Sequence, residues 1–512
     1  MVTKRVLYDK GGGEKVDNTR KSGILLHPTS LHSKYGIGSL GDEAYEFVNY
    51  LVKAEQKLWQ MCPLGPTGYG DSPYQCFSAF AGNHILIDLE KLNEEGLLEK
   101  EDLDNLPEFD ENRVDYGKVI VEKEKLLWKA FKKFEERYGE LERGKFERFC
   151  ESSSEWLEDY ALFMSTKAKY GGRPWCEWDE EIKLREEAAM REYKEKLAGD
   201  IKYHKFLQWK FNEQWMLLKA YANSSGVEII GDIPIYVAFD SADAWSNSEL
   251  FQFDENKNPT AVAGVPPDYF SKTGQLWGNP LFDWDKLKET DYEWWVKRIE
   301  NCTKISDIVR IDHFRGFASY WSVEADEETA LNGVWKKGPG SDLFYKIRKK
   351  LGELPIIAED LGFITPDVYE LKDEFAFPGM KILQFAFDSA EDSTDFYPHM
   401  YEKNCLVYTG THDNDTVVGW YKNSKEEDVK AAEEYLNMRP GDSVNWAFIR
   451  TAWASTAMIA IAPMQDILGL GSDSRMNIPG TTQNNWQWRI KKEDLNDGVA
   501  AKLRKLTKIY MR

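Results

Sequence analysis

The chain has 512 residues, 42% of them hydrophobic and 30% charged, which is a balance typical of globular proteins. Its formal net charge of -21 disfavours nucleic acid or another polyanion as a partner, because affinity for phosphate depends on Lys and Arg. No apolar run is long enough to cross a membrane, so no membrane partner is expected. A neutral substrate is compatible with this composition, and the length permits one large barrel with insertions or several smaller domains.

Cysteine usage and the amino-terminal segment predict a reducing, cytoplasmic setting. The six cysteines include no pair at CxxC spacing, so neither a disulfide framework nor a zinc site is expected. The first 15 residues contain no apolar core of signal-peptide length. Residues 1–20 are polar and include three consecutive glycines, which is typical of a mobile tail.

The first part of the chain predicts two strands followed by a long helical insertion. Apolar runs at residues 22–31 and 57–64 predict the strands, and a Gly- and Tyr-rich loop at 65–83 follows them. This loop either binds a ligand, with Ser72 and Tyr74 as polar and aromatic groups, or packs on itself. We therefore divide this part into 21–84, with two barrel strands and a substrate loop, and 85–225, an inserted helical subdomain.

Strands and helices alternate again in residues 226–512, which we assign to the remainder of the barrel. Strands are predicted from residue 227, from 308 to 312, at 354–359, at 381–389, at 405–413 and at 458–470, which brings the total to eight. A Gly/Pro-rich segment at 264–280 predicts a lid loop that carries Asp268 and Trp277. Helices are expected at 294–305 and near 494–506. This alternation favours an α/β fold with a parallel sheet.

Acidic residues follow three of the predicted strands. Arg310 and Asp312 lie on the same face of one strand, which suits either a structural ion pair or a carboxylate nucleophile held by a guanidinium. Glu359 and Asp360 end the next apolar run, and His412 and Asp413 end another. Because a parallel barrel gathers its catalytic groups at the carboxyl ends of its strands, this recurrence favours a closed barrel enzyme.

Three segments, IVRIDHFRG at 308–316, IIAEDLG at 356–362 and YTGTHDNDT at 408–416, resemble conserved segments of the 4-α-glucanotransferases. This family, also called amylomaltases or disproportionating enzymes, is glycoside hydrolase family 77 of the α-amylase clan. The segments at 65–75, 264–280, 465–471 and 475–489 are similar too. The resemblance implies a (β/α)8 TIM barrel with inserted, mainly helical subdomains.

By the same resemblance, Asp312 is the nucleophile, Glu359 the general acid/base and Asp413 a third acid that binds sugar hydroxyls. No metal and no cofactor are implied. The implied substrate-binding residues are Ser72, Tyr74, Asp268, Trp277, Arg310, His313, Asp360, Asp388, His412 and Asn485.

The implied function is transfer of α-1,4-glucan segments with retention of configuration. A donor maltodextrin forms a covalent glycosyl-Asp intermediate, and the 4-hydroxyl of an acceptor glucan or glucose resolves it. Maltodextrins, amylose and glucose are therefore the expected substrates. Two alternatives stay open from the sequence: an α-glucan hydrolase of the same clan, and a catalytically silent glucan-binding barrel.

Overall fold

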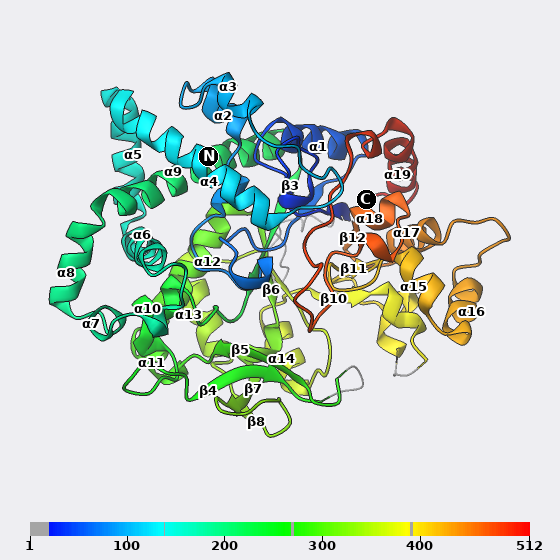
Figure 1. Cartoon of the computed structure of the whole chain (residues 1–512). Helices are drawn as coiled ribbons and strands as arrows, with labels where there is room; N and C mark the ends of the chain where they lie inside the picture. The colour runs from blue at the N-terminus through cyan, green and yellow to red at the C-terminus, as the bar shows by residue number, and fades with distance from the viewer. Residues whose placement is uncertain (1–19, 138, 268–270, 390–392) are drawn as a thin grey trace.

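The computed structural model describes residues 20–137, 139–267, 271–389 and 393–512. Eight parallel strands form its central sheet, in the order β10-β11-β12-β1-β2-β3-β6-β9 (Figure 1). They are β1 (Lys21–Leu25), β2 (Leu58–Gln60), β3 (Glu228–Pro234), β6 (Ile308–Asp312), β9 (Ile356–Ala358), β10 (Gly379–Ile382), β11 (Cys405–Tyr408) and β12 (Ile459–Pro463). Of the predicted tail, residues 1–19 lie outside the described part of the chain.

The sheet closes on itself between β9 and β10. The main-chain N–H of Ala358 donates to the carbonyl of Pro378 over 3.0 Å, and the carboxylate of Asp360 accepts from the N–H of Met380 over 2.6 Å. Inward-facing apolar side chains from all eight strands, such as Ile230 and Leu406, fill the interior. The structure thus confirms the predicted α/β barrel.

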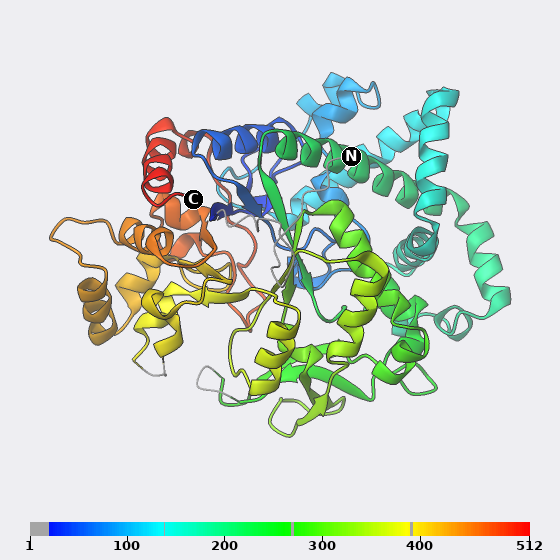
Figure 2. The same ribbon diagram turned by 180° about the vertical axis from the view of Figure 1, so that it is seen from behind.

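The chain between β2 and β3 is mainly helical. Its many charged residues, with aromatic residues at helical spacing between them, predict this. Its longest helix, α9 (Ala198–Ser224), packs against β3 and against α1 (Asp42–Lys53), and therefore serves as the barrel helix that joins β2 to β3. The helices of this insertion lie to one side of the barrel in both ribbon views (Figures 1 and 2). They are α2 (Leu89–Glu94), α3 (Lys100–Asp104), α4 (Tyr116–Arg137), α5 (Glu140–Ser152), α6 (Ser154–Lys169), α7 (Glu180–Lys183), α8 (Glu187–Lys196) and α9 (Ala198–Ser224).

A second, antiparallel sheet in the order β5-β4-β7-β8 was not expected from the sequence. Its strands are β4 (Ala261–Val265), β5 (Gln275–Pro280), β7 (Ser319–Glu324) and β8 (Val334–Lys337). Within the segment 264–280, predicted as a lid loop, residues 264–265 belong to β4 and residues 275–280 form β5, and these two strands pair. The segment's glycines and prolines favour a loop locally, whereas pairing of β4 with β7, which is distant in sequence, makes it a strand.

Two other predicted strands are shorter than expected. The run at 381–389 is a strand only to Ile382 and then continues as a 3-10 helix. The run at 458–470 is a strand only to Pro463, after which α18 (Met464–Leu468) begins.

Within the described residues, no helix has both the length and the apolarity to span a membrane. The remaining helices are α10 (Ala242–Ser246), α11 (Trp284–Glu289), α12 (Glu293–Ile305), α13 (Ser341–Leu351), α14 (Pro366–Glu374), α15 (Val417–Asn423), α16 (Glu426–Tyr435), α17 (Val444–Ala454) and α19 (Asp497–Ile509).

Candidate active site

An arginine held between two carboxylates occupies the carboxyl ends of β3 and β6. The register of these strands places Asp232 opposite Arg310. The guanidinium of Arg310 pairs with Asp232 at 2.6 Å and with Asp312 at 2.8 Å. The Arg310 and Asp232 side chains are almost fully buried, whereas that of Asp312 is 30% exposed. Asp312 is therefore the carboxylate of this trio that a solute can reach, and a buried guanidinium fixes its orientation.

Glu359 lies beside Asp312 at the end of the neighbouring strand. Ile311 and Ala358 are paired in the ladder between β6 and β9, so the two acids follow matched positions. The Glu359 carboxyl group accepts hydrogen bonds from the main-chain N–H of His313 at 2.7 Å and of Leu361 at 2.9 Å. Burial, and then the charge of Asp312, raise the pKa of Glu359 to about 8, although Arg310 opposes the shift. Glu359 is thus protonated at neutral pH, next to an ion-paired carboxylate.

The third acid, Asp413, follows β11. Its Oδ1 accepts a hydrogen bond from the Asn477 side chain at 2.6 Å, and its Oδ2 lies 3.4 Å from Nε2 of His412. The guanidinium of Arg475 also donates to the main-chain carbonyl of Asp413. With 45% of its side chain exposed, Asp413 keeps a face open to a ligand while its neighbours hold it in place.

Tyr74, from the loop at 65–83, joins the two parts of the site. Its hydroxyl donates to Oδ2 of Asp232 over 2.8 Å. Its ring stacks on the imidazole of His412, with centroids 5.1 Å apart and planes 15° from parallel. A single side chain therefore links the Asp232–Arg310–Asp312 trio to the His412–Asp413 pair, so all three predicted acids belong to one site.

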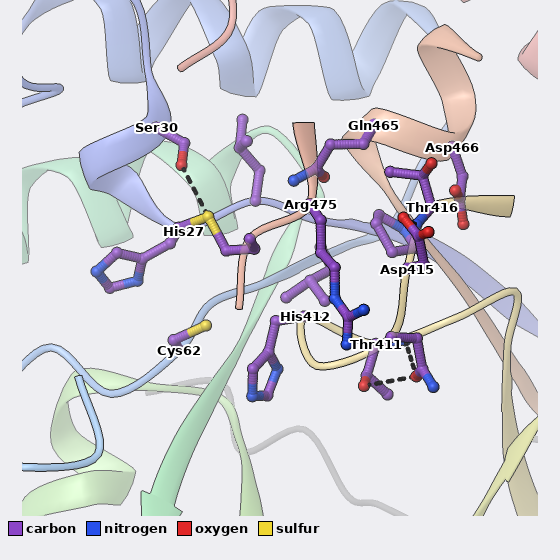
Figure 3. A pocket seen from close by; sticks show the side chains of 15 residues that line it. His27, Ser30, Cys62, Thr411, His412, Asp415, Thr416, Gln465, Asp466 and Arg475 are labelled. Carbon is purple, nitrogen blue, oxygen red and sulfur yellow. Dashed lines mark hydrogen bonds between the residues drawn. The ribbon is translucent and has the colours of Figure 1, made fainter. Parts of the chain in front are cut away.

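A small cavity of about 30 Å³ lies behind His412, where β1, β11 and β12 end (Figure 3). His27, Cys62 and His412 lie along one side of it, and Arg475 reaches in from another (Figure 3). Burial lowers the pKa of His27 to about 3, and its buried Nδ1 has no hydrogen-bond partner among the described residues.

His313 and Trp277 form a second aromatic contact at the rim. His313 adopts a left-handed backbone conformation with φ of 52°, which turns the chain sharply after Asp312. Its ring meets that of Trp277 edge to face, with centroids 4.7 Å apart. Burial, and then Arg315, lower the pKa of His313 to about 3, so the imidazole is neutral.

Ser72 lies two residues before Tyr74. Its hydroxyl accepts a hydrogen bond from the main-chain N–H of Tyr74 at 3.3 Å.

Other residues predicted to bind substrate already have partners within the protein. The buried carboxylate of Asp360 pairs with Lys372 at 2.9 Å in addition to its contact with Met380. The Asn485 side chain accepts from the N–H of Ile478 and donates to Thr481, so it fixes the local loop. Asp388 follows the 3-10 turn after β10 and is partly buried, and Asp268 lies outside the described residues.

Two groups of the site were not predicted from the sequence. Asp232 lies two residues before the end of β3, opposite Arg310, so an acid near the end of a strand was the available signal. Asn477 had no local signal, because only the fold brings it to Asp413. Among the described residues, no group of three or more His, Cys, Asp or Glu side chains is arranged to hold a metal ion.

A parallel barrel that presents an ion-paired carboxylate, a protonated carboxyl group and a third acid at its strand ends has the features of an enzyme that processes glycosidic bonds. A family model described as 4-alpha-glucanotransferase, glycoside hydrolase family 77, matches residues 26–495. The chain belongs to this family. Membership confirms the predicted family and the predicted enzyme class, a 4-alpha-glucanotransferase that acts on α-1,4-glucans.

Similar proteins extend over nearly the whole chain. A 4-alpha-glucanotransferase of a Synechocystis strain is 50% identical over 496 residues, which cover 96% of this chain and 98% of the relative. One from Thermus thermophilus is 49% identical over 492 residues, 95% of this chain and 97% of the relative. The solved structure of an amylomaltase from Streptococcus agalactiae in complex with acarbose has a TM-score of 0.93 and 44% identity, and covers 96% of this chain and 99% of that one.

Proposed function

We propose that this enzyme transfers α-1,4-glucan segments with retention of configuration, and that Asp312 is the nucleophile. The observation that carries the proposal is the pair formed by Asp312, ion-paired with Arg310, and Glu359, protonated at neutral pH. Asp312 attacks the anomeric carbon of the donor while Glu359 protonates the departing glycosidic oxygen. The products of this step are a glycosyl-Asp312 ester and a shortened glucan with a free 4-hydroxyl.

The second step returns the enzyme to its starting state. Glu359, now ionised, takes the proton from the 4-hydroxyl of an acceptor glucan or glucose as that oxygen attacks the anomeric carbon. The bond to Asp312 breaks, and Asp312 regains its negative charge beside Arg310. Water in place of the acceptor gives hydrolysis, so the acceptor site must favour sugar.

Asp413 and the two histidines are proposed to bind sugar hydroxyls. The exposed face of Asp413 accepts hydrogen bonds from a sugar, and Asn477 and His412 hold it for that purpose. The imidazole of His313, which contacts Trp277, is neutral, so one ring nitrogen can donate a hydrogen bond to a sugar and the other can accept one. Ser72, Trp277, Asp388 and, through the loop it fixes, Asn485 are proposed to line further parts of the substrate site. The proposed substrates are maltodextrins, amylose and glucose.

The setting of the reaction is proposed to be the reducing cytoplasm. All six cysteines lie in the described part of the chain and all are free, and three of them are buried.

The Streptococcus agalactiae relative is described as bound to acarbose, which supports a carbohydrate ligand for the corresponding site.

Incubation with maltotriose tests the proposed reaction. Transfer gives a ladder of longer oligomers together with glucose, whereas hydrolysis gives maltose and glucose alone. The Asp312→Asn variant is expected to produce neither, and Asp326→Asn, which changes an exposed acid, serves as its control. Full activity of Asp312→Asn contradicts the nucleophile assignment.

A further inference from the structure

A crevice of about 600 Å³ lies between the helical insertion and the barrel. It is bordered by α6 and α9 of the insertion and by α10 and α12, and α6, α10 and α12 lie near one another to the left of the barrel in Figure 1. Its lining reaches Tyr74 and Asp232 of the active site. Its volume is within the range of pockets that hold small molecules.

Aromatic rings form one part of the crevice lining. Phe80 and Trp156 lie nearly parallel, 14° apart in plane with centroids separated by 6.4 Å. Trp294 meets Phe80 edge to face at 5.9 Å. Trp156 and Phe80 are only partly buried, so their surfaces border the space and offer the C–H faces of a sugar ring an apolar contact.

The charges of the lining are largely neutralised. Seven acidic and three basic side chains border the crevice. Five of the acids are ion-paired with a cation: Glu155, Asp159, Asp232, Glu293 and Glu300. Because this excess of acids repels an anion, and because the pairing leaves little free charge for a cation, the lining favours a neutral ligand.

Partly exposed amide side chains supply polar groups to the crevice. Asn212 on α9 and Asn301 on α12 both border the space and are only partly buried. An amide offers both a donor and an acceptor, so these side chains suit the hydroxyls of a sugar.

We propose that this crevice is a second carbohydrate site that takes a neutral gluco-oligosaccharide of about disaccharide size. The inference rests on the proposed substrate class and extends it to a place outside the catalytic acids. The sugar ring lies against Trp156 and Phe80, and its hydroxyls bond the amide side chains of the lining.

Equilibrium dialysis of labelled maltose against the Asp312→Asn protein tests the proposal, since this variant is expected not to consume the sugar. The expected result is about two molecules bound per chain at saturation, and about one after the additional change Trp156→Ala. Trp446→Ala removes a tryptophan of similar burial on α17, away from the crevice, and is expected to leave the number unchanged. A single molecule bound with Trp156 intact overturns the inference.

A second variant covers the case in which Trp156→Ala does not fold. Ser152 is exposed at the end of α5 and borders the crevice, so Ser152→Trp fills the entrance without removing any core contact. It is expected to lower the bound maltose in the same way, and unchanged binding overturns the inference. Transfer from maltotriose by the unaltered enzyme is measured alongside, so that failure of the second site is distinguished from failure of the proposed function.

Discussion

The ring of Tyr74 stacks on the imidazole of His412 while its hydroxyl donates to Asp232, so one side chain contacts both parts of the active site. The stack and the hydrogen bond are separable. A phenylalanine at this position keeps the ring and loses the hydroxyl.

We expect Tyr74→Phe to lower kcat about tenfold, because a buried carboxylate loses a donor worth about 1–2 kcal/mol and Arg310 moves toward Asp232. KM for maltotriose is expected to change less, because the stacked ring remains. Steady-state kinetics of glucose release measures both. Tyr401→Phe, which removes a hydroxyl that donates to the carbonyl of Phe396 elsewhere, is the control. An unaltered kcat in Tyr74→Phe contradicts this role of the hydroxyl.

Arg310→Lys keeps the positive charge and removes the planar group that contacts two carboxylates at once. The lysine side chain is shorter and ends in a single ammonium group. It cannot reproduce the contacts of 2.6 and 2.8 Å that the guanidinium makes with Asp232 and Asp312 together. We expect kcat to fall about 100-fold, or about 2.7 kcal/mol in the activation barrier, with a smaller effect on KM. Arg450→Lys changes a partly buried arginine far from the acids, and comparable losses in both variants count against the proposed role of Arg310.

The pH dependence of transfer reports on Glu359. Its pKa is raised to about 8 by burial and by Asp312, so this proposed proton donor carries its proton below that pH and loses it above. Activity is therefore expected to fall as the pH rises through about 8. Glu359→Gln is expected to lower kcat by about 100-fold or more and to remove this alkaline decline. Glu353→Gln, at an exposed position on the same segment, is the control, and a decline that persists in Glu359→Gln assigns it to another group.

Stability is expected to depend on pH through Asp466, a buried acid of α18. Burial raises its pKa to about 7, although the Thr409 hydroxyl and the N–H of Val417 donate to it. The folded protein thus holds a proton that the unfolded chain releases near pH 4, so stability falls as the pH rises from about 4 to 7. The slope for this group is about 1.4 kcal/mol per pH unit.

The Asp466→Asn variant is expected to lose this slope, since the amide stays neutral and can bond both partners. Urea unfolding at pH 5 and pH 8 measures the difference. Asp326→Asn, at an exposed site, is expected to retain the slope. Equal pH dependence of Asp466→Asn and the unaltered protein contradicts the prediction.

Much of the barrel follows from local patterns in the sequence. Each central strand is a short apolar run between helical segments, and the acids at 312, 359 and 413 end three of these runs. The second sheet was missed because its strands are stabilised by partners far along the chain. Ser322 of β7, for example, pairs with Ala263 of β4, and no pattern within either strand indicates this.

The site was less predictable than the fold because its geometry depends on the direction in which each side chain points. Glu359 and Asp360 are adjacent acids with similar chemistry. Glu359 turns toward Asp312, and Asp360 turns toward Lys372. The local sequence gives both the same expectation, and only the position of the neighbouring strand distinguishes them.

The joint between β9 and β10 depends on that difference. A side chain, that of Asp360, holds the amide of Met380, where the other strand neighbours of the barrel are joined by continuous backbone ladders. The barrel is thus closed by this carboxylate, which lies next to the proposed proton donor, together with the backbone bond from Ala358 to Pro378. A substitution that removes the charge of Asp360 therefore weakens the joint between β9 and β10 beside Glu359. It is expected to change the shape of the barrel first, and the binding of a sugar only as a result.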